Sequence, residues 1–256
     1  MERGEDRRRC LTERFGIKAE EDEFVVALAG NPNVGKSTVF NALTGMHQHT
    51  GNWAGKTVVG AQGRFSWLGQ RFVLVDLPGT YSLRARRAEE AVTRDFICFG
   101  RPDAVVVVVD ASSLERNLFL LLQVLEITRR VVLCVNLLDE AKANGITVDL
   151  LRLEELLRLS VIGTSARQKE GLYELRNVLV RICTASELRE PRANQYSPAI
   201  ESAVEELLPY MKRAAGDLFE ARWLSMRKLE GDDECIRTVK QILSLPGVEG
   251  GDVCDV

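Results

Sequence analysis

A short stretch near the N-terminus has the residue types and spacing of a phosphate-binding loop. Gly30, Gly35, Lys36 and Ser37 fit the pattern G-x-x-x-x-G-K-[ST] between an apolar run and a helical pattern. In such a loop, backbone N–H groups turn toward a triphosphate, the lysine reaches the β- and γ-phosphates, and the Ser hydroxyl is a magnesium ligand. The N-terminus of the following helix adds partial positive charge. The residues assigned here to the nucleotide are Gly30, Asn31, Asn33, Val34, Gly35, Lys36, Ser37 and Thr38.

A carboxylate about forty residues further along supplies a second magnesium ligand. Asp76 ends the apolar run 72–75 and is followed by Leu-Pro-Gly. We predict that Asp76 binds magnesium and that the backbone N–H of Gly79 meets the γ-phosphate.

The residues that select the base of the nucleotide are expected at the ends of two later apolar runs. Asp139 can accept hydrogen bonds from N1–H and the amino group of guanine, which adenine does not offer. Asn136, three residues earlier, is expected to bridge loops around the base. A backbone N–H within Thr164, Ser165 or Ala166 is placed to meet guanine O6.

Five apolar runs alternate with helical patterns, which predicts a three-layer α/β domain with a mostly parallel sheet. Each run ends on a polar residue or glycine, the position from which parallel strands present ligands. The segment 57–67 alternates and is predicted to be an antiparallel edge strand. The apolar runs are 24–29, 72–75, 104–109, 131–135 and 161–164. The helical patterns are 37–44, 88–99, 114–128, 150–159 and 172–184.

The pattern changes after the α/β domain. The segment from Glu190 to Pro198, with two prolines, is typical of a linker, and apolar residues three and four apart then predict about three helices. Pro209 is expected to kink or end the first of them. The predicted boundaries are a charged, mobile arm at 1–22, the α/β domain at 23–186, a linker at 187–198, a helical subdomain at 199–246 and a polar tail at 247–256.

Composition narrows the class of protein. The chain has 256 residues, 45% of them hydrophobic, and a formal net charge of −3. That charge argues against a nucleic-acid partner. No apolar run approaches the 18 or so residues of a membrane span, and the N-terminus lacks a signal peptide. Six widely spaced cysteines indicate reduced thiols. The expected compartment is the cytoplasm.

The ordered motifs resemble those of translation-factor-type small GTPases, which implies the P-loop GTPase fold with GTP or GDP and magnesium. Two positions depart from that pattern. Leu137 replaces the lysine that usually packs over the base, which suggests fast nucleotide exchange. Thr80 replaces the glutamine that usually positions the attacking water.

A closer resemblance is to the bacterial ferrous iron transport protein B family. It is carried by the strings at 49–57, 76–83 and 109–118, and in the helical part by 222–224 and 228–232. The resemblance implies a GTPase with slow intrinsic turnover that regulates ferrous iron transport across the inner membrane. The helical subdomain resembles the family's nucleotide-release-inhibitor-like spacer, which would relay switch movement to a membrane permease.

The same resemblance implies further residue roles. Thr57 would be the first-switch threonine that closes on magnesium. Potassium would bind Asn33 and backbone carbonyls at Gly51 and Trp53. The residues expected to act in hydrolysis are Lys36, Asn33, Thr57 and Gly79.

The resemblance also implies partners and a location. The permease would be part of the same polypeptide or a separate subunit, and a small SH3-like accessory protein and a homo-oligomer are further expected partners. The chain would lie in the cytoplasm or at the cytoplasmic face of the inner membrane.

Several alternatives stay open at this point. A potassium-dependent GTPase acting on RNA shares the Asn-bearing loop, and a switch that binds nucleotide without hydrolysis shares all the motifs. His47 and His49 are either exposed loop residues or iron ligands. Trp53 either packs on the domain or shields the nucleotide. The basic residues Arg84, Arg86 and Arg87 form either a solvated face or a docking site.

Overall fold

The computed structural model divides the chain into two compact units, which are described separately. The first unit comprises residues 1–125 and 129–192, and the second comprises residues 126–128 and 193–256. The residues that the structure describes are 11–45, 48–52, 59–84, 87–185, 190–192, 194–216 and 219–243.

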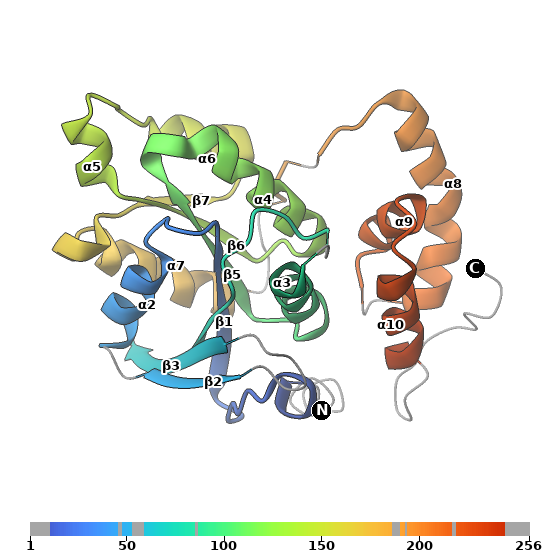
Figure 1. The fold of residues 1–256 in the computed structure, drawn as a ribbon, viewed down its shortest axis with the longest axis horizontal. Helices are drawn as coiled ribbons and strands as arrows, with labels where there is room; N and C mark the ends of the chain where they lie inside the picture. Colours follow the sequence, from blue (N-terminus) through green and yellow to red (C-terminus); the bar gives the residue numbers. More distant parts are fainter. Residues whose placement is uncertain are drawn as a thin grey trace. The chain divides into compact units, whose positions relative to one another are not determined.

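The first unit is built on a seven-stranded sheet in the order β2-β3-β4-β1-β5-β6-β7 (Figure 1). The strands from β4 to β7 in this order run parallel to one another. Strand β3 runs antiparallel to both of its neighbours, β4 and β2. The five predicted apolar runs are the five parallel strands, as expected for strands buried on both faces. The bounds are β1 Glu23–Gly30, β2 Gln48–Asn52, β3 Val59–Trp67, β4 Gln70–Asp76, β5 Ala104–Asp110, β6 Val131–Asn136 and β7 Ser160–Gly163.

One strand prediction needs correction. Residues 59–67 of the alternating segment do form the antiparallel strand β3, but β3 is not at the edge of the sheet. Strand β2, which the sequence pattern did not predict, pairs outside it. Pairing with β2 fills the hydrogen-bonding edge that β3 would otherwise expose.

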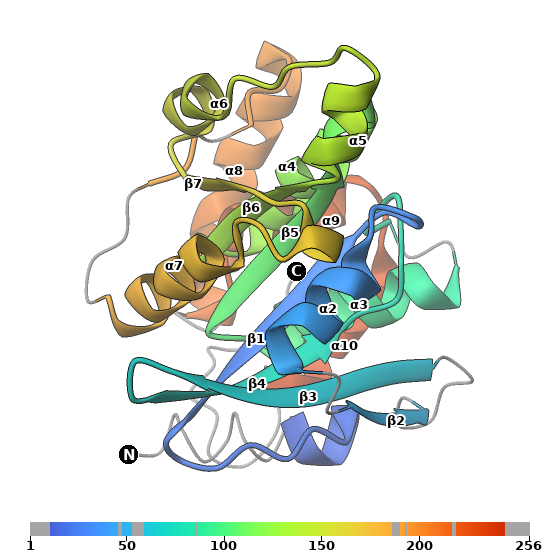
Figure 2. The same cartoon turned by 90° about the vertical axis from the view of Figure 1, so that its left-hand side faces the viewer.

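Helices cover both faces of the sheet. Figures 1 and 2 show α2 and α7 on one face and α3 and α4 on the other. Residues of β1, β5 and β6 pack with α2 and α7 in the main apolar cluster. The helices of the first unit are α2 Lys36–Thr44, α3 Ala88–Phe99, α4 Leu114–Ile127 (its last two residues are assigned to the second unit), α5 Leu138–Ala143, α6 Leu150–Leu157 and α7 Leu172–Thr184, with 3-10 turns η1 Ala111–Ser113 and η2 Ala166–Gln168.

The N-terminal segment differs from the expected mobile arm over residues 1–22. Residues 11–15 are helical, and Leu11, Phe15 and Ile17 are only 1%, 7% and 5% exposed. The Phe15 ring packs edge-on against Phe96 of α3, with ring centroids 5.1 Å apart. The prediction was wrong for residues 11–22 because three apolar residues within seven positions suffice to anchor a short segment on a helix.

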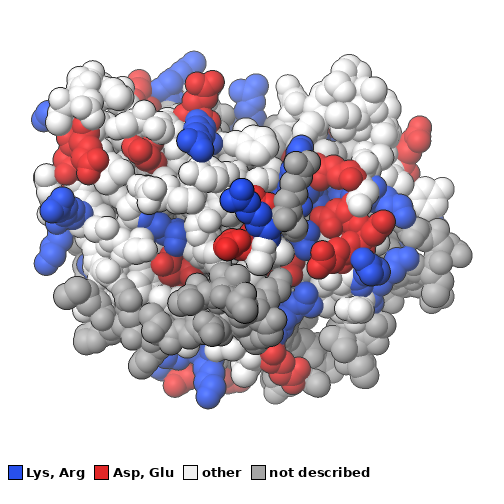
Figure 3. Space-filling model, viewed as in Figure 1, with Lys and Arg blue, Asp and Glu red and all other residues white. Residues whose placement is uncertain are grey.

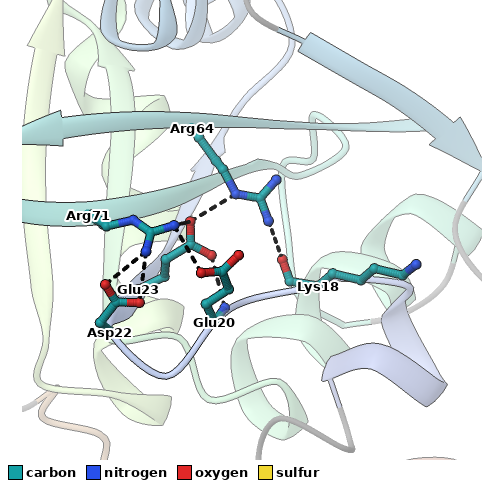
Figure 4. Close-up of polar contacts among 6 residues, drawn as sticks. All are labelled: Lys18, Glu20, Asp22, Glu23, Arg64 and Arg71. Carbon is teal, nitrogen blue, oxygen red and sulfur yellow. Dashed lines mark hydrogen bonds and ion pairs between the residues drawn. The ribbon is translucent and has the colours of Figure 1, made fainter.

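Charged residues at the end of this segment hold two strands of the sheet (Figure 4). The buried Glu23 carboxylate accepts from Arg64 of β3 at 2.9 Å, and Arg64 also donates to the Lys18 carbonyl at 2.7 Å. Arg71 of β4 pairs with both oxygens of Asp22, at 2.8 and 3.0 Å. The segment therefore contacts both α3 and the β3–β4 hairpin.

In the described residues from 194 to 243 the second unit contains three helices, as predicted: α8 Pro198–Ala215, α9 Ala221–Leu229 and α10 Asp233–Leu243. Helix α8 continues past Pro209 to Ala215, so the proline does not end it. A bidentate pair of 2.8 Å contacts joins Arg222 of α9 to Glu201 of α8. These hydrogen bonds hold the pKa of Glu201 at about 2.

Candidate functional site

The parallel strands bring the predicted nucleotide residues to one edge of the sheet. Strands β1, β4 and β6 end at Gly30, Asp76 and Asn136 respectively. Because the carboxyl ends of parallel strands share an edge, residues more than one hundred positions apart meet there.

The phosphate loop has the backbone that its glycines permit. Gly35 precedes α2 with φ +77°, in the left-handed region that favours glycine. A Cβ at this position would collide with the Asn136 amide. Asn33 also has a positive φ, 68°, so two of the loop's residues adopt conformations that expose backbone N–H groups on its concave side.

Lys36, Ser37 and Asp76 lie together, as predicted. The buried Lys36 ammonium forms an ion pair with the Asp76 carboxylate, and the Ser37 side chain hydrogen-bonds the same carboxylate. Burial raises the pKa of Asp76, and the contacts with Lys36 and Ser37 oppose that rise. A carboxylate and a hydroxyl oxygen beside the phosphate loop are the hard donors that magnesium prefers, so this pair fits the ion.

Asn136 joins two loops, as the sequence predicted. Its amide donates to the Val34 carbonyl at 3.0 Å. Its oxygen accepts from the Thr164 hydroxyl at 3.0 Å and from the Ala166 N–H at 3.1 Å. A single buried side chain therefore ties the phosphate loop to the loop at 164–166.

The predicted base-reading residues lie beside this bridge, with two details that the sequence did not reveal. The Asp139 carboxylate accepts from the Gln168 side chain at 3.1 Å. The backbone N–H groups of Thr164, Ser165 and Ala166 donate to Val135 O, Glu170 O and the Asn136 side chain. A contact of one of them with guanine O6 therefore stays a prediction, and it requires one of these bonds to open.

The loop after Asp76 is held against the phosphate loop and against two helices. The N–H of Thr80 donates to Gly30 O at 3.1 Å, and Gly79 lies directly on Pro32. The Thr93 hydroxyl on α3 donates to Pro78 O at 3.2 Å.

Helix α4 holds the far end of the same loop. The Gln123 side chain accepts from the Leu83 N–H at 2.7 Å. The guanidinium of Arg116 lies 4.5 Å from the Tyr81 ring centroid. Helix α4 therefore contacts this loop, as α3 does.

Some predicted site residues cannot be placed. Trp53, Thr57, His47 and Arg86 lie outside the described residues. Gly51 lies in the edge strand β2, opposite Gly60 of β3. Among the described residues no group of three or more His, Cys, Asp or Glu side chains could hold a metal ion. In the described helices, none combines the length and apolarity of a membrane span.

Comparison with known proteins assigns the family. Residues 24–179 match the family model for ferrous iron transport protein B, and residues 196–246 match the model for the FeoB cytosolic helical domain. The chain belongs to the ferrous iron transport protein B family. The two matched regions correspond to the sheet-containing unit and to the helices of the second unit.

Solved and curated members of the family agree with this assignment. The cytosolic domain of the Thermotoga maritima FeoB iron transporter in its GDP form I is 35% identical, with a TM-score of 0.79 over 89% of this chain and 88% of that one. Its GMPPNP form is also 35% identical, with a TM-score of 0.77 and 87% coverage of each chain. The Fe(2+) transporter FeoB of Methanocaldococcus jannaschii is 40% identical over 85% of this chain. The chain spans about a quarter to a third of the length of the curated relatives it matches.

Proposed function

We propose that this chain is the GTP-binding and GTP-hydrolysing module that regulates ferrous iron transport through a membrane permease. The observation that carries the proposal is the Asn136 bridge. It fixes the phosphate loop against the loop at 164–166, with the Asp139 carboxylate beside it. In the proposed complex, the phosphates of the guanine nucleotide lie at the phosphate loop, and the base lies between Asp139 and the loop at 164–166.

Guanine recognition rests on Asp139. Its carboxylate accepts from Gln168 here, and a carboxylate has enough lone pairs to accept from guanine N1–H and the 2-amino group. Adenine lacks both donors at these positions. The nucleotides bound by the T. maritima domain, GDP and GMPPNP, are of this class.

Phosphate binding requires Lys36 to exchange partners. Its ammonium pairs with Asp76 in this structure, and it turns to the β- and γ-phosphates when a nucleotide binds. Gly79 then offers its N–H to the γ-phosphate. Ser37 and Asp76, joined by a hydrogen bond, would hold magnesium, which neutralises charge between the β- and γ-phosphates when bound.

Potassium is the proposed source of further positive charge. Thr80 follows Gly79, at the position where related GTPases have the glutamine that positions the attacking water. The Thr80 hydroxyl donates to Ser82 O at 2.8 Å. Asn33 lies in the phosphate loop at a positive φ, and we propose it as the side-chain ligand, with carbonyls of the first switch. Of these carbonyls, only that of Gly51 lies in the described part of the chain.

The proposed partner is a ferrous iron permease at the cytoplasmic face of the membrane, either in the same polypeptide or as a separate subunit. The relatives are Fe(2+) transporters about three to four times as long as the matched region. Family membership favours this function over an RNA-associated GTPase. On the face shown in Figure 3, acidic and basic side chains of the described residues are interspersed, without a continuous basic surface for an RNA backbone.

The test of base selectivity is a binding titration with GDP, ADP and xanthosine diphosphate. The unchanged chain is expected to bind GDP and not ADP. Asp139→Asn is expected to lose GDP affinity and gain xanthosine diphosphate, because an amide can donate to the xanthine carbonyl. Equal binding of GDP and ADP would contradict the proposal.

The test of hydrolysis compares GTP turnover in potassium and in sodium at equal ionic strength. Turnover is expected to be faster in potassium, and Asn33→Ala is expected to abolish the difference while GDP still binds. Identical rates in the two salts would exclude the potassium mechanism. Absence of turnover in both would leave a nucleotide-binding switch.

A further inference from the structure

Asn31, in the phosphate loop, is a buried amide whose hydrogen-bonding capacity is unused. The residue is 3% exposed. Neither its oxygen nor its nitrogen has a hydrogen-bond partner among the described residues. The other buried amide at the site, Asn136, makes three hydrogen bonds. Because buried polar groups are nearly always paired, an amide with both atoms unpaired at a binding site requires an explanation.

The backbone on either side of Asn31 contacts the loop that follows Asp76. Gly30 O accepts from the Thr80 N–H at 3.1 Å. An added Cβ on Gly79 would lie 3.3 Å from Pro32 Cα and N, a tight approach of one loop to the other. Asn31 therefore lies at the joint between the phosphate loop and the loop at 77–84.

Strand alternation indicates which side of the sheet Asn31 faces. Val26 and Leu28 of β1 pack into the cluster formed with α2 and α7. Odd-numbered residues of β1 face the opposite layer, because side chains alternate along a strand. Continuing this alternation one residue past the strand places Asn31 on the α3 and α4 side. The loop at 77–84 is held on that side, through Thr93 and Gln123.

We propose that Asn31 is a positioning residue for the triphosphate state, a role that rests on the proposed function. When the Gly79 N–H turns to the γ-phosphate, the backbone at 77–84 shifts against residues 30–32, and its peptide groups become the partners of the Asn31 amide. GDP has no γ-phosphate, so the amide gains nothing when GDP binds. Asn31 thereby helps the site to discriminate GTP from GDP through its side chain, whereas the nucleotide contact predicted for Asn31 as part of the phosphate loop is made by backbone N–H groups, which Asn31→Leu keeps.

The test compares Asn31→Leu with the unchanged chain by titration with GDP and with the non-hydrolysable analogue GMPPNP. Leucine has the same number of side-chain heavy atoms, branched at the same carbon, and no polar atoms, although its two methyl groups are larger than the amide. GMPPNP affinity is expected to fall about fivefold, the value of one net hydrogen bond, while GDP affinity stays within about twofold. The melting temperature without nucleotide is expected to stay equal or rise, because replacing an unpaired buried amide by an apolar group removes a desolvation cost.

A matched control and a second variant complete the experiment. Asn41 on α2 also has a buried oxygen without a partner among the described residues, and Asn41→Leu is expected to leave the ratio of the two affinities unchanged. Asn31→Ser, which keeps a small polar group, replaces Asn31→Leu if the latter does not fold and is expected to keep part of the GMPPNP preference. Equal losses of GDP and GMPPNP affinity, or no loss of either, would overturn the proposal. If the unchanged chain binds neither nucleotide, the proposed function fails instead, and the same titration shows this first.

Discussion

At the scale of single residues, the Asn136 side chain connects two loops of the site through three hydrogen bonds. It is buried and satisfies the Val34 carbonyl, the Thr164 hydroxyl and the Ala166 N–H at once. Asn136→Ala removes three hydrogen bonds, although the Thr164 hydroxyl keeps its 3.3 Å contact with Cys134 Sγ. We expect the free energy of unfolding to fall by about 3 kcal/mol, at about 1 kcal/mol for each bond, and nucleotide affinity to fall with it.

Urea denaturation measures this change. Asn144→Ala is the control, because Asn144 is an exposed asparagine at the end of α5, and we expect it to change stability by less than about 0.5 kcal/mol. Equal stability of the two variants would show that the Asn136 bridge is dispensable.

A second consequence at this scale concerns Cys134 on β6. Burial raises the pKa of its thiol to about 12, so the reactive thiolate is absent at neutral pH. We expect iodoacetamide at pH 8 to leave Cys134 unmodified in the native protein and to alkylate it in urea, as read by peptide mass spectrometry. Alkylation of Cys134 at similar rates in both states would mean that β6 opens readily.

At the scale of elements, the N-terminal segment holds α3 and the β3–β4 hairpin together. Phe15 anchors the segment on Phe96, and Glu23 and Asp22 hold Arg64 and Arg71. Phe15→Ala removes most of the apolar anchor, a change of about 3 kcal/mol for a buried phenylalanine. We expect the detached form of the segment to become about a hundredfold more populated.

Hydrogen exchange measures that opening. Amides at 11–23 and along β3 are expected to exchange faster in Phe15→Ala, while those of α7, which packs on the other face, stay unchanged. Leu68→Ala, at a 68% exposed position in the same hairpin, is the control. Faster exchange at 11–23 alone would show that the segment does not support the hairpin.

At the scale of the whole molecule, the chain has two compact units, and we expect nucleotide binding to stabilise only one of them. All proposed nucleotide contacts come from the first unit. GDP at one hundred times its Kd stabilises the unit that binds it by about 2.7 kcal/mol, which raises the Tm of that unit by about 5–10 °C. The transition of the second unit is expected to stay in place.

Tryptophan fluorescence separates the two transitions. Trp223 lies in the second unit, and Trp53 and Trp67 in the first. A Trp223→Phe variant reports the first unit, and a Trp53→Phe, Trp67→Phe variant reports the second. Equal GDP shifts in both variants would mean that the two units unfold as one.

The sequence by itself determined the class of fold and which residues the site brings together; their chemical roles stay predictions. Gly30 to Ser37, Asp76 and Asn136 to Asp139 are local patterns at the ends of apolar runs, and parallel strands necessarily bring those ends to one edge. The buried strands and most helices followed from hydrophobic periodicity, because burial on one or both faces is recorded in neighbouring residues. The family resemblance agreed, and the family models confirmed it.

Only the tertiary structure decided which groups pair across long separations. Strand β2 is too polar and Gly-containing to be predicted from its own residues, and its partner β3 defines it. The buried N-terminal residues, the contact of Gln168 with Asp139 and the unpaired amide of Asn31 depend on what other elements place nearby. Hydrogen bonds and side-chain packing between distant residues leave no periodic trace along the chain, so their presence or absence is decided only when the chain folds.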